Sequence, residues 1–264
     1  MQQKIETFIR GLGVDDVGFA RAEDYHNPKS YPVTHFLPAA KSIIVLAFKV
    51  LSNCESPSES VALNGYMDLG AFARTVLYRT SRFLESAMNA KVATMPLSYP
   101  LEIRKEKPGI ADFSQRHAAV AAGLGQLGRH NLVVHPRFGT RVNFVSIITD
   151  IPLAASAKPP EDACIHCNIC VENCPGNALA EEGRTDLIKC MKHSLPYGLG
   201  ADIGFWSQLV DSSPETRNEL LRSEQYARLR QAAHLGSQYM CFQCMKSCPV
   251  GVDGAESQTA TANK

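Results

Sequence analysis

The sequence predicts a mixed α/β (α+β) fold for its first part, followed by a smaller cysteine-rich part. Three observations carry this prediction. The run from Ser42 to Val50 is apolar, β-branched and preceded by a proline-containing turn, as in a buried strand. Apolar residues then recur at helical spacing from Val61 to Met88. All cysteines except Cys54 lie between Cys164 and Cys248.

Weaker patterns complete the first part. A helical pattern from Ile5 to Leu12 ends at Gly11 and Gly13, which are typical of a helix stop. The other predicted elements are a strand over 14–20, a strand over 91–97, a helix over 113–122 and a hairpin-like pair of strands over 132–135 and 141–149. Residues 98–112 contain Pro100 and Pro108 and are predicted to be irregular, as a pocket rim or lid.

The composition is that of a globular protein. Of the 264 residues, 45% are hydrophobic and 20% are charged, and the formal net charge is +1. With so little net charge, we expect neither a nucleic acid nor a membrane as a partner. The N-terminus carries polar and acidic residues in place of an apolar signal segment, and no apolar run is long enough to span a membrane. We therefore expect a cytoplasmic protein, in a compartment where thiols stay reduced.

A linker separates the two parts. Residues 154–160 (AASAKPP) are small and include prolines. We therefore predict a first domain over 1–153 and a second over 154–252, with a helical stretch from about Pro214 to Leu235. Residues 253–264 are small and polar, which predicts a disordered tail.

The cysteine spacing is the strongest signal in the sequence. Cys164 begins a C-x2-C-x2-C-x3-C-P run, and Cys241 begins a C-x2-C-x3-C-P run. Runs of this kind hold iron–sulfur clusters in two-cluster ferredoxins, where the fourth cysteine of a run binds the other cluster. The physical reason is that three thiolates at two-residue gaps can surround one cluster, whereas the helix that follows carries the fourth away.

Two four-iron clusters need eight thiolates, and the two runs together with Cys190 supply that number. The crossing pattern predicts one ligand set made of Cys164, Cys167, Cys170 and Cys248. It predicts a second set made of Cys174, Cys190, Cys241 and Cys244. Zinc also binds paired C-x2-C motifs, but it explains neither the third cysteine at a two-residue gap nor the repeated C-x3-C-P ending. Disulfides are disfavoured because nothing marks the chain as secreted. Cys54 is predicted to be an ordinary thiol.

A glycine-rich segment follows the helix predicted over 113–122. Gly123, Gly125 and Gly128 form a G-x-G-x-x-G pattern. This pattern does not follow a strand and open a helix, so we reject a dinucleotide-binding site. The three glycines do predict a backbone that approaches another group closely, because they lack Cβ.

The segments 116–132 and 136–142, with the ending at 149–153, resemble the glycine-rich segment of epoxyqueuosine reductases and corrinoid reductive dehalogenases. In those families such a segment precedes two cysteine runs like the ones here, and the lone Cys190 matches the epoxyqueuosine reductase arrangement. The resemblance covers roughly residues 1–250. The export signal of respiratory dehalogenases and the C-terminal helical-repeat domain of epoxyqueuosine reductases have no counterpart in the sequence.

This resemblance implies a nitroreductase-like α/β domain that binds cobalamin, joined to a ferredoxin-like domain with two [4Fe-4S] clusters. Electrons would pass from a low-potential donor of the ferredoxin or flavodoxin type through the clusters to cobalt, which would reduce an organic substrate. By resemblance, the residues near the corrinoid or its nucleotide tail would be Gly123, Gly125, Gly128, Arg129, His130 and Asn131.

Three residues are candidates for the proton donor of such a reaction. The position of the acidic residue that serves in epoxyqueuosine reductases is Gly109 here, and Asp112 lies shortly after it. Tyr99, in the segment predicted to be irregular, is a candidate of the dehalogenase type. His117, on the predicted helix, is the third candidate.

These features favour a cytoplasmic, cobalamin-dependent iron–sulfur reductase with a small-molecule substrate. An alternative of a different class is an electron carrier or reductive activator that serves a partner and has no corrinoid and no substrate chemistry of its own. A third hypothesis keeps the corrinoid and delivers electrons to a separate corrinoid protein. Copurified corrinoid and turnover without a partner would separate the first hypothesis from the others.

Overall fold

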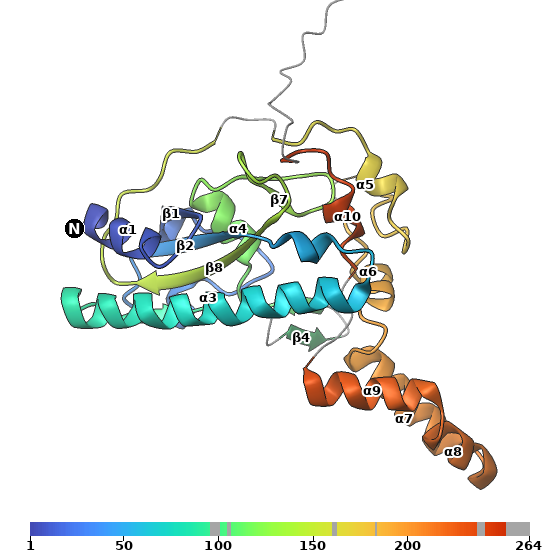
Figure 1. Ribbon diagram of the computed structural model, residues 1–264. Helices are drawn as coiled ribbons and strands as arrows, with labels where there is room; N and C mark the ends of the chain where they lie inside the picture. Colours follow the sequence, from blue (N-terminus) through green and yellow to red (C-terminus); the bar gives the residue numbers. More distant parts are fainter. Residues whose placement is uncertain (96–100, 105–106, 160–162, 183, 237–240, 252–264) are drawn as a thin grey trace, which may run out of the picture.

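Helices cover both faces of one antiparallel sheet (Figure 1). The structure is a computed structural model that describes residues 1–95, 101–104, 107–159, 163–182, 184–236 and 241–251. The sheet has the strand order β1-β2-β8-β3, and all neighbouring strands are antiparallel. These strands are β1 (Asp16–Arg21), β2 (Ser42–Lys49), β8 (Val142–Thr149) and β3 (Val92–Thr94).

The strand β2 is buried along almost its whole length because both of its faces are covered. On one face, side chains such as Leu46 pack in a cluster with α1 (Gln2–Arg10) and α3 (Glu59–Met88). On the other face, side chains such as Val45 pack with α4 (Gln115–Ala121). A strand between two helical layers buries both of its alternating sets of side chains, which is why the sequence shows a continuous apolar run here.

Most of the predicted elements of the first part are confirmed. The predicted strands over 14–20 and 42–50 correspond to β1 and β2, and the predicted strand over 91–97 is represented by the shorter β3. The helices predicted from the periodicity of residues 5–12, 61–88 and 113–122 correspond to α1, α3 and α4.

The predicted hairpin over 132–135 and 141–149 is wrong. β7 (Val133–Val134) pairs with β6 (Gln126–Leu127), whereas β8 joins the large sheet between β2 and β3. The chain does turn between them, where His135 and Gly139 form an isolated bridge. Most of β8 is buried, so its partners are the core strands and not its neighbour in the sequence.

Residues 101–104 and 107–111 form regular structure where the sequence predicted none. β4 (Leu101–Arg104) and β5 (Lys107–Ala111) form a two-stranded antiparallel ribbon. Pro108 lies within β5, opposite Ile103. A two-stranded ribbon has a free edge on each strand, which is the kind of strand in which proline is found. The other short elements of the first part are η1 (Ala22–Asp24), α2 (Val33–Phe36) and η2 (Ser52–Glu55).

The second part is helical. Its elements are α5 (Ile169–Glu172), α6 (Leu187–Ser194), α7 (Leu199–Asp211), α8 (Pro214–Leu221), α9 (Glu224–Leu235) and α10 (Gln243–Lys246). Helices α7, α8 and α9 form an arm that extends away from the sheet (Figure 1). The single helical stretch predicted over 214–235 is two helices, because the Ser223 hydroxyl accepts the N–H of Tyr226 and starts α9. Within the described ranges, no helix has both the length and the apolar character needed to cross a membrane.

The predicted linker is fixed to the first part of the chain. The N–H of Ser156 donates to the carbonyl oxygen of Phe19 (2.8 Å), and its hydroxyl accepts the N–H of Phe19 (2.9 Å). The linker therefore runs along β1 rather than free in solvent. The division into domains over 1–153 and 154–252 stays a prediction, and the predicted tail over 253–264 lies outside the described residues.

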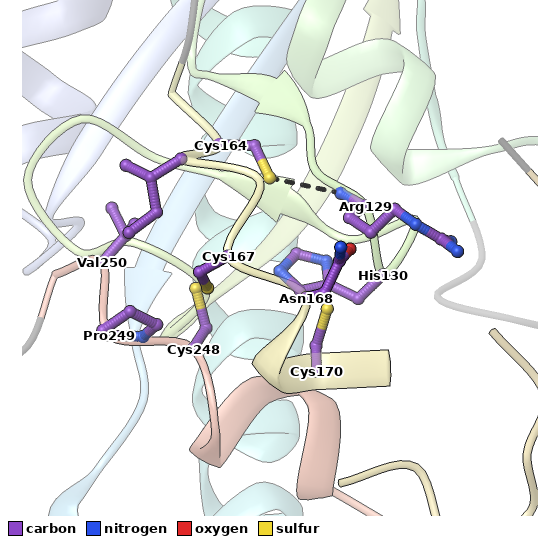
Figure 2. A pocket seen from close by; sticks show the side chains of 10 residues that line it. Arg129, His130, Cys164, Cys167, Asn168, Cys170, Cys248, Pro249 and Val250 are labelled. Atoms are coloured by element: carbon purple, nitrogen blue, oxygen red, sulfur yellow. Dashed lines mark hydrogen bonds between the residues drawn. The ribbon is translucent and has the colours of Figure 1, made fainter. Parts of the chain in front are cut away.

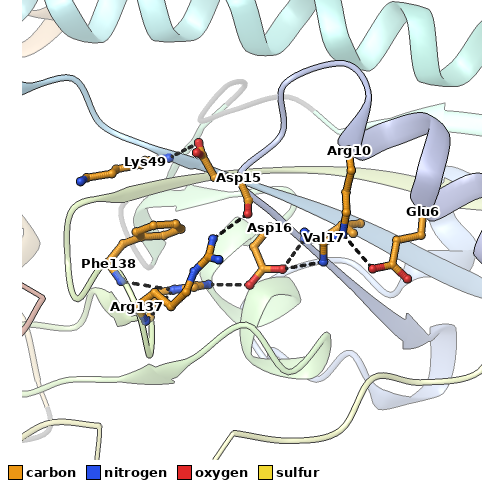
Figure 3. Close-up of polar contacts among 9 residues, drawn as sticks. Glu6, Arg10, Asp15, Asp16, Val17, Lys49, Arg137 and Phe138 are labelled. Atoms are coloured by element: carbon orange, nitrogen blue, oxygen red, sulfur yellow. Dashed lines mark hydrogen bonds and ion pairs between the residues drawn. The ribbon is translucent and has the colours of Figure 1, made fainter. Parts of the chain in front are cut away.

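A polar network ties the turn after β7 to the start of β1 (Figure 3). The Asp16 carboxylate accepts hydrogen bonds from His135 Nε2 (3.2 Å) and from the Arg10 guanidinium (3.0 Å). Burial by itself would raise the pKa of Asp16, but the bonds from His135, the Val17 N–H and Arg10 lower it to about 2. The carboxylate is thus held in its charged form, and it anchors the turn against the sheet.

Arg141 joins the second cysteine run to the first part of the chain. Its guanidinium donates to the carbonyl oxygens of Cys248 (2.8 Å) and Lys246 (3.1 Å) and pairs with the Glu55 carboxylate (2.6 Å). Beside it, Met245 of α10 is buried in the core cluster that includes α1 and α3. The end of the cysteine part is therefore packed into the core of the sheet layer.

We predict that Arg141→Met lowers the free energy of unfolding by about 3 kcal/mol or more, because the substitution leaves buried carbonyl oxygens and a carboxylate without their donor. Anaerobic urea unfolding of the metal-loaded protein measures this change. The control is Arg21→Met, since Arg21 forms ion pairs with its side chain 57% exposed, and its loss should change the free energy of unfolding far less. Equal losses in the two variants would contradict the role given to Arg141.

Candidate metal centres

The first thiol group consists of Cys164, Cys167, Cys170 and Cys248, which line one pocket (Figure 2). Burial raises the pKa of the Cys170 thiol, and the nearby thiols of the other three cysteines raise it further. Three of the four come from the first cysteine run, and the fourth is the last cysteine of the second run. This is the composition that the crossing pattern predicted for one ligand set.

Two left-handed residues shape the loop that carries the first group. His166 (φ 51°) and Asn168 (φ 61°) adopt positive φ between the cysteines. Asn168 then begins the short helix α5, where its carbonyl oxygen accepts the N–H of Val171 (2.8 Å). Because α5 starts there, Cys170 lies in the helix and faces the pocket, whereas Cys174 is carried past its end.

The second thiol group consists of Cys174, Cys190, Cys241 and Cys244. Burial raises the pKa of the Cys244 thiol to about 12, and the thiols of Cys190, Cys241 and Cys174 contribute to the rise. Burial likewise raises the pKa of the Cys190 thiol, which also interacts with Cys174 and Cys241. The interacting thiols come from three segments of the chain: the first run, α6 and the second run. The grouping equals the second predicted ligand set; the ligand role of all eight thiols stays a prediction.

The remaining cysteine belongs to neither group. Cys54 is fully buried and packs against Gly65 of α3. A Cβ at Gly65 would lie only 2.8 Å from the Cys54 sulfur. In the described ranges, no three His, Cys, Asp or Glu side chains lie close enough together to share a single metal ion. The thiols within each group are therefore farther apart than the ligands of a single metal ion would be.

Arg129 and His130 lie against the first thiol group, where the resemblance had implied a corrinoid contact. The backbone N–H of Arg129 donates to the Cys164 sulfur (3.4 Å), and its guanidinium donates to the carbonyl oxygens of Leu179 (2.7 Å) and Glu181 (3.2 Å). His130 is buried, and burial lowers its pKa to about 4, so the ring is neutral at neutral pH. Both residues therefore contact the cysteine part of the chain in this structure.

The three glycines of the G-x-G-x-x-G pattern make room for the chain itself. A Cβ at Gly123 (φ +75°) would lie 2.3 Å from the carbonyl oxygen of Ala157, and a Cβ at Gly125 would lie 2.4 Å from that of Val134. A Cβ at Gly128 would lie 2.7 Å from the His130 ring. The close approach predicted from these glycines is present, but it is an approach to protein atoms.

The glycine-rich segment therefore offers no open cradle for a corrinoid at these positions. Asn131 (φ 60°) also contacts the chain, since its carbonyl oxygen accepts a hydrogen bond from the Arg116 guanidinium. The corrinoid role of the glycines and of Arg129, His130 and Asn131 stays a prediction that these contacts do not support.

Neither Asp112 nor His117 is among the residues that line the pocket of the first group. Asp112 follows β5, is half-buried, and its carbonyl oxygen accepts the N–H of Tyr31 (3.0 Å). His117 lies on α4, where Nδ1 is 2.7 Å from the Ser114 hydroxyl, and burial lowers its pKa. Tyr99 lies outside the described residues. A catalytic role for any of the three stays a prediction.

Two arginines near the thiol groups were not singled out from the sequence as site residues. Arg116 on α4 is half-buried; burial lowers its pKa, and its charge interacts with Cys190. Arg141 interacts with Cys248 in the same way. Each looks like an ordinary helix or strand residue in the sequence, because its partner is supplied by a segment far away in the chain.

Comparison with known proteins agrees with the cysteine analysis. The model of the 4Fe-4S binding domain family matches residues 158–180. The chain is 25% identical over 218 residues to an epoxyqueuosine reductase of Staphylococcus aureus, a match that covers 72% of this chain and 55% of the relative. The chain thus spans about half the length of the curated relatives it matches. The family model supports an iron–sulfur cofactor.

Two solved structures have a similar fold. An epoxyqueuosine reductase with an epoxyqueuosine-modified tRNA stem loop matches with a TM-score of 0.60 and 18% identity, over 95% of this chain and 65% of that one. A catabolic reductive dehalogenase matches with a TM-score of 0.52 and 19% identity, over 88% of this chain and 36% of that one. These matches confirm the mixed α/β fold and the resemblance to both families.

The expectation that a nucleic acid would not be a partner is wrong. It is overturned by the match to an epoxyqueuosine reductase that was solved with a tRNA stem loop. The expectation rested on the formal net charge of +1. Net charge is a poor guide here, because contacts to a stem loop depend on where charges lie on the surface and not on their sum.

We predict that Cys170→Ser and Cys244→Ser each remove about half of the bound iron, because each substitution breaks a different set of four thiolate ligands. Iron and acid-labile sulfide per chain, measured after anaerobic purification, test this prediction. Cys54→Ser is the matched control and should keep the full iron content. If either ligand variant keeps all of its iron, the assignment of that thiol group is contradicted.

Proposed function

We propose that this chain, an iron–sulfur protein related to the epoxyqueuosine reductases and similar in fold to the reductive dehalogenases, is a reductase that holds a four-iron cluster in each thiol group. The observation that carries the proposal is the crossing of the two cysteine runs into two groups of four. A single zinc site would not need Cys174 and Cys248 to exchange places.

The residues that would hold the clusters fit them chemically. Four thiols line the first site, and the four thiols of the second group interact with one another. The N–H of Arg129 donates to the Cys164 sulfur, and Arg116 and Arg141 place positive charge beside Cys190 and Cys248. Bound clusters supply one-electron transfer at potentials set by their ligands, hydrogen bonds and burial. The two arginines would partly balance the negative charge of a thiolate-bound cluster.

The surroundings suggest a direction for electron flow. In the first group Cys167 is exposed, and its neighbour Ile165 is 61% exposed, so an external donor can approach this side. In the second group Cys190 lies beside Arg116 of α4, and α6 contacts β5, the strand that leads to Asp112. We propose that electrons enter at the first group and leave from the second, toward α4 and β5.

Cobalamin is the acceptor we propose at that side. The support is the fold shared with a reductive dehalogenase whose structure was described in terms of B12-dependent dehalogenation. The glycine-rich segment gives no support, since its glycines are filled by the chain itself. A cytoplasmic location, where thiolates stay reduced, fits this chemistry.

A second candidate function is an electron carrier or reductive activator for a partner, without a corrinoid. One observation favours it: the space beside each glycine of the G-x-G-x-x-G pattern is occupied by other atoms of the chain. This leaves no room for a corrinoid at these glycines. The large sheet layer argues against it, because a carrier of electrons alone needs only the cysteine part.

The two functions are separated by adding cobalamin to the anaerobically purified protein, removing the excess, and measuring cobalt and the EPR spectrum. The reductase predicts about one cobalt per chain and its reduction to Co(I) by a low-potential donor. In Cys244→Ser the cobalt should still bind but its reduction should slow by at least about tenfold, because the path to it is broken. Iron without retained cobalt would contradict the cobalamin proposal and favour the electron carrier.

The substrate is tested with the same preparation. An epoxyqueuosine-containing tRNA stem loop is the first compound to try, because a related fold was solved with one. Halogenated aromatic compounds are the second, because another related fold was solved with 3-bromo-4-hydroxybenzoic acid. Single-turnover reduction of either, dependent on cobalt, would assign the substrate class.

A further inference from the structure

His130 has a buried polar atom without a partner. The residue is 5% exposed and lines the pocket of the first thiol group (Figure 2). Within the described part of the chain, its Nε2 atom has no hydrogen-bond partner. A buried donor left unpaired destabilises the folded chain, because the donor loses its hydrogen bonds to water and gains none in return. The position of this ring therefore needs an explanation that the protein atoms do not supply.

The other ring nitrogen determines where the proton lies. Nδ1 of His130 accepts the backbone N–H of Leu132 at 3.1 Å. A nitrogen that accepts a hydrogen bond carries no proton, so the hydrogen of the neutral ring is on Nε2. The unpaired atom is therefore an N–H donor at the wall of a pocket lined by four thiols.

The backbone around the ring is adapted to hold it there. A Cβ at Gly128 would lie 2.7 Å from Cε1 of His130, so only glycine leaves room for the imidazole. Between them, the N–H of Arg129 already donates to the sulfur of Cys164 at 3.4 Å. The segment 128–130 thus brings one backbone donor and one side-chain donor to the same pocket.

We propose that His130 Nε2–H donates a hydrogen bond to a sulfur atom of the cluster held by the first thiol group and thereby raises the reduction potential of that cluster. The inference rests on the proposed function, which puts a cluster in this pocket. Reduction adds one electron and no proton, so the sulfur atoms become more negative. A fixed N–H donor then stabilises the reduced form more than the oxidised form. His130 is accordingly a positioning and tuning residue and not a catalytic one.

The test is a redox titration of the iron-loaded protein, followed by EPR, for the native chain and for His130→Phe. The equilibrium constant for reduction of the first cluster should fall about tenfold, which is about 59 mV for a one-electron couple. The potential of the second cluster should stay unchanged and so serves as an internal reference. His130→Gln, which keeps an N–H donor on a side chain of similar reach, should restore the native potential to within about twofold in the same constant.

The matched control is His234→Phe, which removes an exposed histidine on α9 and should shift neither potential. An unchanged first potential in a fully iron-loaded His130→Phe would overturn the inference while leaving the proposed function intact. Absence of iron in the native chain would instead overturn the proposed function.

A second measurement decides the question if His130→Phe fails to assemble its cluster. Native protein labelled with ¹⁵N-histidine should show a nitrogen coupling to the reduced first cluster in pulsed EPR. The coupling should disappear in His130→Gln, where the donor nitrogen is unlabelled. A native spectrum without histidine coupling would overturn the inference.

Discussion

The exchange of one cysteine between the two runs is the constraint on which the rest of this structure depends. Cys174 leaves the first run for the second group, and Cys248 returns to the first. For this exchange the end of the cysteine part has to come back beside its beginning. Helix α10 meets that requirement by burying Met245 in the core of the sheet layer, with Arg141 holding the carbonyl oxygens that follow. Cluster binding and folding of the sheet layer should therefore be coupled.

Strong local periodicity made part of the fold predictable. The run 42–50 and the stripe over 61–88 reappear as β2 and α3, because each buries a complete face and its pattern is independent of the rest of the chain. The partner of β8 was not predictable in this way. Its apolar pattern says that it is buried, but not that β2 and β3 flank it, since strand order depends on contacts distant in sequence.

The candidate site, like the fold, could be predicted from the sequence only in part. The two groups of four cysteines follow from the ferredoxin-type spacing, and the structure assembles the thiols in those groups. The environment of the thiols was not predictable, because Arg116, His130 and Arg141 reach them from elements of the first part. His130 illustrates the difficulty. The family resemblance implied a corrinoid contact for this residue, which stays a prediction, whereas its place in the wall of the cysteine pocket could be seen only in the structure.

Counting the iron and sulfide of the native chain tests the central claim most directly. Anaerobically reconstituted protein, analysed for both elements and by Mössbauer spectroscopy, should contain about eight of each per chain, all in four-iron clusters. The exchange of Cys174 and Cys248 requires both clusters to be present in one chain. A plateau at about four irons, or zinc in place of iron, would contradict the account.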